Sequence, residues 1–134
     1  MSADVNIKTI QMVYEAFGRG DVAAILASVA DDVDWASEAA GSGAPWYGVR
    51  TGREEVAAFF TEFGSTMEVE DFTPVTFAGT ETEVLTVVRL AAKSRATGRR
   101  VAMDLHHYFR FRDGKVAYYR GTEDTAQTEV ALKG

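Results

Sequence analysis

The sequence predicts an α+β fold in which a curved, mostly antiparallel sheet wraps over three helices. Three segments of the first half carry apolar residues at i, i+3, i+4 and i+7, which is the spacing of amphipathic helices. From Met67 onward the pattern changes to that of strands. Asp113-Gly114 lies between two such strands and indicates a hairpin, because glycine accepts the positive φ of a tight turn. Since each helix must bury its apolar stripe, we expect the three to share one sheet and to enclose a cavity with it.

The three helices are expected over residues 4–18, from Asp21 onward and from Thr51 onward. Gly18 and Gly20 end the first helix, and Asp21 can cap the second. Thr51 and Glu54 have the spacing of a capping box at the start of the third. The apolar stripes are Ile10, Val13, Tyr14 and Phe17, then Val22, Ile25, Leu26 and Val29, then Val56, Phe59, Phe60 and Phe63.

Strands and loops fill the rest of the predicted order, ααβαββββ. A short strand is expected over 33–37, and longer strands over 67–78 and 83–92, with a turn near 95–98. Pro74 interrupts the 67–78 strand, which suggests an edge position or a bulge. The glycine-rich loop over 39–50 carries Trp46 and Tyr47, which either roof the cavity or close the end of a helix.

Composition narrows the classes of function. The 134 residues suit a single domain spanning 1–134. Cysteine is absent and the first residues do not resemble a signal peptide, so we expect a cytoplasmic protein without disulfides or a membrane span. The net charge of −6 argues against a nucleic-acid partner, and the cluster of Arg95, Arg99 and Arg100 is expected to be solvated.

His107 interrupts an apolar wall. Alternation over 101–111 places Leu105, His107 and Phe109 on the face toward the helices. An imidazole there is either a neutral core residue, hydrogen-bonded to Tyr119 or to the backbone, or a proton shuttle and hydrogen-bond donor in a pocket. Burial should lower its pKa unless Glu123 comes close. His106 points to the opposite face, so the two histidines cannot chelate one metal ion, and we expect no metal site.

The register of the final hairpin has two alternatives. A two-residue turn would pair His107 with Arg120, whereas a three-residue turn with a glycine bulge would pair it with Tyr119. The bulged turn is favoured because it keeps the Arg120 guanidinium out of the interior, where an unpaired charge is costly. This choice directs Ala117, Tyr119, Gly121 and Glu123 inward.

The outer face of the sheet should be mixed in character. Val87, His106, Tyr108 and Arg110 are expected there, and Arg89 can face Asp104 if the turn at 95–98 has four residues. Such a surface is compatible with a dimer interface. We therefore expect a homodimer.

Several short motifs resemble the SnoaL-like families of the NTF2-like, or cystatin-like, superfamily. This superfamily includes ketosteroid isomerases, polyketide cyclases and limonene epoxide hydrolase. The motifs span nearly the whole chain: 13–17 (VYEAF) with Gly20-Asp21, 31–35 (DDVDW), 52–56 (GREEV), 112–116 (RDGKV) and Asp124-Thr125. The resemblance implies a cone-shaped fold, but not one reaction, because one fold hosts many activities.

The resemblance also assigns positions, and two signature carboxylates are missing. Ser37 stands where ketosteroid isomerases keep a general-base aspartate and where the epoxide hydrolase has an asparagine. Trp35 stands where the hydrolase has a pocket tyrosine, and Gly121 where it has a catalytic carboxylate. His107 falls where the isomerases hold a protonated aspartate in the oxyanion hole.

Together these observations predict a protein that binds a hydrophobic small molecule in an apolar pocket. It could be a cofactor-independent isomerase, cyclase or hydrolase acting on a ring-containing carbonyl or epoxide compound, or a non-catalytic binding or assembly module. The catalytic candidates are His107 and Glu123. The candidate ligand-binding residues are Tyr14, Trp35, Ser37, Trp46, Tyr47, Leu105, Phe109 and Tyr119.

Overall fold

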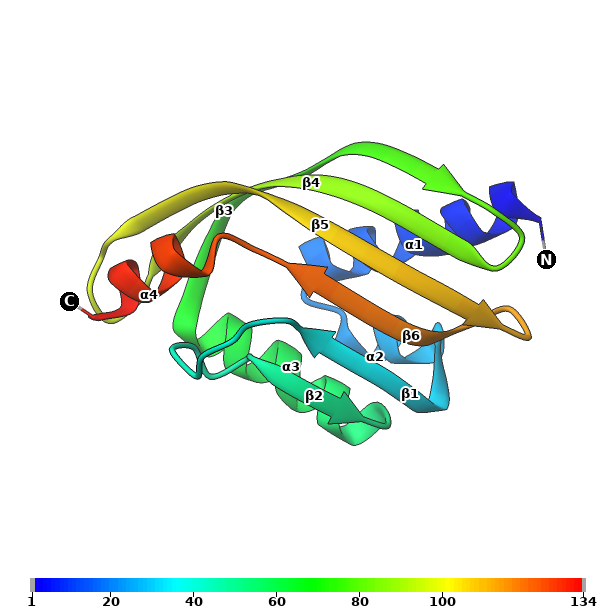
Figure 1. Cartoon of the computed structure of the whole chain (residues 1–134), viewed down its shortest axis with the longest axis horizontal. Helices are drawn as coiled ribbons and strands as arrows, with labels where there is room; N and C mark the ends of the chain where they lie inside the picture. The colour runs from blue at the N-terminus through cyan, green and yellow to red at the C-terminus, as the bar shows by residue number, and fades with distance from the viewer. Residues whose placement is uncertain (1, 134) are drawn as a thin grey trace.

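The computed structural model describes residues 2–133, and its sheet curves over helices α1, α2 and α3 (Figure 1). Within those residues the strand order is β2-β1-β6-β5-β4-β3, antiparallel except for the parallel pair β1–β6. The elements are α1 (Ala3–Arg19), α2 (Val22–Ala27), β1 (Val29–Ser37), β2 (Gly48–Thr51), α3 (Arg53–Thr66), β3 (Met67–Gly79), β4 (Glu83–Ser94), β5 (Arg100–Arg112), β6 (Lys115–Thr122) and α4 (Thr125–Lys133). The α+β prediction is confirmed.

Local sequence signals set the first two helices. The Ser2 side chain accepts a hydrogen bond from the Val5 amide at the start of α1, and Gly20 ends it in the left-handed conformation. The Asp21 side chain accepts from the Ala24 amide at 3.1 Å and caps α2, as predicted. The helices bury their stripes against the concave face of the sheet, where Ile10 and Phe109 are among the fully buried side chains.

Two predicted helix boundaries and one predicted cap were wrong, and the predicted order lacked strand β2, which begins at Gly48 within the expected 39–50 loop. Val29 begins β1 and is not part of the second helix. Thr51 ends the short strand β2, and Gly52 is the N-cap of α3, so the predicted capping box does not form. Instead the Thr51 amide donates to the Glu55 carboxylate at 2.9 Å.

A fourth helix, α4, was not expected from the sequence. It lies beside the connection between β4 and β5, at the C-terminal end of the chain (Figure 1). The Thr97 hydroxyl donates to the Ala131 carbonyl at 2.7 Å, and the Ala102 amide donates to the Gln127 side chain at 2.6 Å. Contacts with the sheet therefore hold a segment that has only a weak apolar stripe of its own.

The final hairpin combines both of the predicted alternatives. The turn has two residues, Asp113 and Gly114, both with positive φ, so Arg112 pairs with Lys115. A bulge follows, because Phe111 pairs with Val116 while Arg110 pairs with Tyr118, and Ala117 is the extra residue.

The bulge changes which residue of β6 lies opposite His107, but it does not change which of Tyr119, Arg120 and Gly121 point to the interior. His107 lies opposite Gly121, rather than Arg120 or Tyr119 as predicted. Tyr119 and Gly121 still border the interior, whereas Arg120 forms ion pairs with Asp34 and Glu38 outside it.

Strand β3 lies at one edge of the sheet, and its register shifts twice along β4. One shift falls between Pro74 and Thr76, as expected for a proline that cannot donate to the ladder. The other falls between Val69 and Asp71. Pro74 therefore marks both an edge and a bulge.

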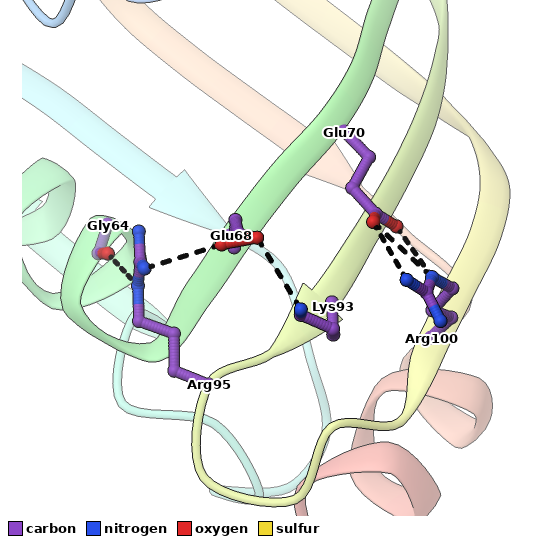
Figure 2. A network of polar contacts seen from close by, with 6 residues as sticks. All are labelled: Gly64, Glu68, Glu70, Lys93, Arg95 and Arg100. Carbon is purple, nitrogen blue, oxygen red and sulfur yellow. Dashed lines mark hydrogen bonds and ion pairs between the residues drawn. The ribbon is translucent and has the colours of Figure 1, made fainter.

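Ion pairs connect β3 with β4 and β5 near the loop of residues 95–99 (Figure 2). Glu68 lies 3.6 Å from the Lys93 ammonium and 3.9 Å from the Arg95 guanidinium, and Glu70 lies 3.0 Å from Arg100. Arg95 also donates to the Gly64 carbonyl at 2.9 Å. Two of the three clustered arginines are thus paired with carboxylates rather than only solvated.

The register between β4 and β5 agrees with a four-residue turn. Arg89 lies opposite Asp104, as predicted, but its ion pair is with Asp71 on β3, at 3.3 Å.

Within residues 2–133, no helix has the length and hydropathy that crossing a lipid bilayer requires.

Candidate functional site

A cavity of about 80 Å³ lies between the concave face of the sheet and helices α1 and α3. Its wall is mostly aromatic and aliphatic. The lining residues that carry polar groups are Tyr14, Trp35, Ser37, Trp46, His107, Tyr119, Thr122, Glu123 and Thr128. An apolar enclosure with a few convergent polar groups is typical of small-molecule sites.

A chain of hydrogen bonds runs from β4 through α1 to β5. The Thr86 hydroxyl lies 2.6 Å from the Tyr14 hydroxyl, which lies 2.7 Å from His107 Nδ1. Thr86 is buried, and Tyr14 reaches it because α1 packs across β4. The chain fixes the imidazole through Nδ1, and within residues 2–133 no side-chain hydrogen bond is formed at its Nε2.

The enclosure keeps this chain uncharged. Burial, and to a smaller extent the neighbouring His106, lowers the pKa of His107 to about 3. Burial also raises the pKa of Tyr14 well above its usual value, with the Thr86 hydrogen bond acting in the opposite direction. At neutral pH the site therefore presents a neutral imidazole and a neutral phenol. The predicted fall in the His107 pKa is confirmed in direction.

Aromatic rings form the wall beside His107. Tyr119 packs on Trp35 with ring centroids 4.1 Å apart, and it meets the His107 ring edge-to-face at 5.3 Å. The ring centroids of Phe109 and Tyr119 lie 5.0 Å apart. The rings of Trp35, Tyr119 and Phe109 therefore form one continuous aromatic part of the wall.

Glu123 is held by three neutral donors rather than by His107. The Trp46 indole donates to one carboxylate oxygen at 2.9 Å. The Thr128 hydroxyl donates to the other at 2.5 Å, and the Tyr47 hydroxyl does so at 3.4 Å. Glu123 therefore joins the 39–50 loop to α4 at the cavity wall. The prediction that it could pair with His107 is not matched by any contact among residues 2–133.

The structure brings most of the predicted site residues to one cavity. The residues that line it are Tyr14, Trp35, Ser37, Trp46, Leu105, His107, Phe109, Tyr119 and Glu123. Tyr47 does not line the cavity itself and contacts two residues that do, Glu123 and Trp46. Trp46 thus belongs to the roof of the cavity, one of the two roles considered for this loop.

Three polar residues of the site, Thr86, Thr122 and Thr128, were not predicted from the sequence. Thr86 completes the hydrogen-bond chain, and Thr128 completes the shell around Glu123. Thr86 lies in a Val- and Leu-rich strand, opposite His107, so cross-strand pairing could have identified it. Thr128 had no comparable signal because α4 was not expected.

Metal ligands are not concentrated at the site. His106 and His107 lie on opposite faces of β5, and the structured part of the chain, residues 2–133, contains no group of three His, Asp or Glu side chains able to hold an ion.

The profile of the SnoaL-like domain family matches residues 10–119. The chain belongs to this family. The matched region includes the part of α1 from Ile10 onward, every element from α2 to β5, and β6 as far as Tyr119, and so most of the cavity wall. The resemblance predicted from the sequence motifs is therefore confirmed.

Solved structures agree with this assignment. An NTF2-like protein of unknown function from Burkholderia pseudomallei K96243 is 26% identical, with a TM-score of 0.90 and full coverage of both chains. TerC, co-crystallised with polyporic acid, is 21% identical with a TM-score of 0.84, over 97% of this SnoaL-like chain and 99% of TerC. An LEH-like epoxide hydrolase from M. tuberculosis is 18% identical with a TM-score of 0.73, over 98% and 91% of the two chains. The last two likenesses show the shared fold alone. A comparison with curated protein sequences gives no significant match.

Proposed function

We propose that this SnoaL-like protein binds a small, hydrophobic, ring-containing molecule in its cavity, with His107 facing the polar group of that molecule. The observation that carries the proposal is the Thr86–Tyr14–His107 chain, which ends with an unpartnered Nε2 in an aromatic wall, as described for residues 2–133. A fixed polar atom in an apolar cavity orients a ligand at little entropic cost. Co-crystallisation of TerC with polyporic acid supports an organic ligand for this fold.

The ligand should be small. A cavity of about 80 Å³ is roughly half the size of one known to hold benzene, about 150 Å³. One ring fits after modest side-chain adjustment. The Phe60 and Phe63 side chains line the cavity and are only partly buried, so they can move to make this room.

If the protein is an enzyme, the chemistry we propose is cofactor-independent catalysis on a carbonyl or an epoxide, in which His107 acts as a hydrogen-bond donor rather than as a proton acceptor. With its pKa near 3, His107 is a poor base at neutral pH, so hydrogen-bond donation suits it better. Nε2–H would donate to the substrate oxygen and stabilise the negative charge that develops there during isomerisation, cyclisation or ring opening. Tyr14 and Thr86 would hold the imidazole in place.

A second candidate is a binding module without turnover. It is favoured by the shell of Glu123, whose two oxygens accept from Trp46, Tyr47 and Thr128 and leave His107 without a carboxylate partner. Neither Ser37 nor Gly121 supplies the carboxylate that the related enzymes use at these positions.

The experiment is a thermal-shift screen with single-ring ketones and epoxides on the wild type and on His107→Asn. Asparagine can keep the contact of Nδ1 with Tyr14 but has no atom at the position of Nε2. We expect at least one compound to raise the Tm of the wild type and to lose that effect in the variant. No shift with any compound, or equal shifts in both proteins, would contradict the proposal. Mass spectrometry of the bound compound then separates an enzyme, which changes it, from a binding module, which does not.

We further infer a homodimer through the outer face of the sheet. Leu85 is 51% exposed there, beside the partly buried Val87. The Tyr118 ring lies between the Arg110 and Arg120 guanidiniums, at 4.3 and 4.2 Å. Apolar and aromatic groups mixed with arginine are typical of interfaces.

A further inference from the structure

Gly121 makes room for the Tyr119 side chain. A Cβ atom at Gly121 would overlap the Tyr119 hydroxyl and lie 2.8 Å from its Cζ, closer than real Cβ atoms approach. The φ of Gly121 lies outside the left-handed region, so the glycine is required by the neighbouring ring and not by the backbone. The ring of Tyr119 therefore extends along its own strand, across the bare Cα of Gly121.

This placement leaves the Tyr119 hydroxyl at the cavity without a partner. Tyr119 is 4% exposed and lines the cavity, yet within residues 2–133 its hydroxyl makes no hydrogen bond. The Tyr119 hydroxyl is reachable from the cavity, where a bound molecule can supply its partner.

A second unpartnered polar atom lies close by. The same Cβ position at Gly121 is 3.3 Å from His107 Cδ2, the ring atom bonded to Nε2. The two rings meet edge-to-face at 5.3 Å. Two neutral hydrogen-bonding groups, a phenol hydroxyl and an imidazole nitrogen, thus border the same small space over Gly121.

We propose that Tyr119 and His107 together bind one uncharged oxygen of an aromatic ligand, a phenol hydroxyl or an aryl carbonyl, and that Tyr119 determines specificity for that oxygen. This inference rests on the proposed ligand-binding function and narrows its substrate class. A phenol hydroxyl accepts from Nε2–H and donates to the Tyr119 oxygen, whereas a carbonyl oxygen accepts from both groups. An anionic oxygen is disfavoured, because no cation borders this part of the cavity among the residues that line it.

The test measures the binding of phenol and toluene by calorimetry. The two probes have nearly the same shape and differ by one hydroxyl. Tyr119→Phe removes only the hydroxyl, so its affinity for phenol should fall about tenfold while its affinity for toluene changes less than twofold. Tyr118→Phe is the matched control, because it makes the same change on the adjacent residue, which faces Arg110 and Arg120 outside the cavity. It should change neither affinity.

Gly121→Ala is the second variant. Its Cβ displaces the Tyr119 hydroxyl, so the preference for phenol over toluene should be lost. If Tyr119→Phe or Gly121→Ala keeps the wild-type preference, the inference is overturned while ligand binding in the cavity stands. If neither probe binds the wild type at millimolar concentration, and the ketone and epoxide screen is also negative, both proposals fall.

Discussion

At the scale of single residues, the surroundings of His107, rather than its residue type alone, decide its charge at neutral pH. A free imidazole titrates near neutral pH, but this one is enclosed by Tyr14, Phe109 and Tyr119 and bonded through Nδ1. The same residue type at His106, one position earlier, lies exposed on the opposite face. One strand thus carries two histidines with different chemistry.

The stability of the protein should depend on pH through His107. Its pKa is lowered from 6.5 to about 3 on folding, so between these values the unfolded chain binds the proton more tightly. Stability is therefore full above about pH 6.5 and decreases as the pH falls toward 3, by a few kcal/mol in total. We expect His107→Asn to have a shallower decrease than the wild type over this range, as measured by urea unfolding at a series of pH values. If the free energy of unfolding decreases equally in the two proteins as the pH falls, His107 is not the cause of the decrease.

Tyr14→Phe tests the hydrogen-bond chain itself. The ring and its packing on Phe72 remain, but the buried Thr86 hydroxyl and His107 Nδ1 lose their common partner. We expect a loss of about 1–3 kcal/mol in the free energy of unfolding. Adding Thr86→Val removes one of the two orphaned groups, so the double variant should be more stable than the sum of the single changes predicts. Simple additivity would mean that the two hydroxyls are not coupled.

At the scale of elements, α4 and the 39–50 loop behave as one unit because Glu123 bonds to both. The Glu129 side chain of α4 also packs against the loop backbone, since a Cβ at Gly43 would lie 2.5 Å from the Glu129 carboxyl carbon. Ala44 and Ala131 are both buried. The cavity therefore has one wall formed by segments about 80 positions apart in the chain, from Trp46 to Thr128.

Glu123→Ala should loosen this wall without unfolding the sheet. The Trp46 indole and the Thr128 hydroxyl lose their acceptor, so we expect a loss of about 1–3 kcal/mol. Hydrogen exchange should become faster in the amides of α4 and of the 39–50 loop, while β4 and β5 keep their protection. Glu15→Ala, an exposed glutamate on α1, is the control and should change neither segment. Uniform acceleration across the sheet would contradict the local role of Glu123.

The elements also show where sequence reasoning succeeded. Alternation over 101–111 predicted correctly that Leu105, His107 and Phe109 line the cavity. In a strand with one buried face, only one of the two alternating sets of side chains can point to the interior. The bonds of the site were harder to foresee. Tyr14 meets His107 through the packing of α1 on β4, a contact between segments 93 positions apart, for which no local pattern exists. The bulge at Ala117 was likewise hidden, since Asp113-Gly114 specifies the turn but not the ladder beyond it.

At the scale of the whole molecule, the outer face of the sheet is where we propose that two copies meet. It joins the exposed Leu85 to the arginine–tyrosine stack of Arg110, Tyr118 and Arg120. The ion pairs of the 95–99 loop lie at one end of the sheet (Figure 2). They contribute little to stability, because exposed pairs are screened by water and salt.

The proposed dimer makes a direct prediction. The wild type should sediment as a dimer at micromolar concentration, and Leu85→Asp should sediment as a monomer because it places a charge in the apolar part of the interface. Met12→Asp is the matched control, since Met12 is 62% exposed on α1, away from this face. A wild-type monomer, or a Leu85→Asp dimer, would contradict the proposal.

The two edges of the sheet set how copies of this protein can meet. At one edge, β3 lacks an amide hydrogen at Pro74 and is bent by two register shifts. At the other, β2 has only four residues. An incoming strand would find no long, straight ladder at either side, so growth of the sheet from molecule to molecule is blocked. Two copies would therefore associate through the outer face of the sheet rather than through its edges. A symmetric contact covers that face on both copies, which favours a closed dimer over an open fibre.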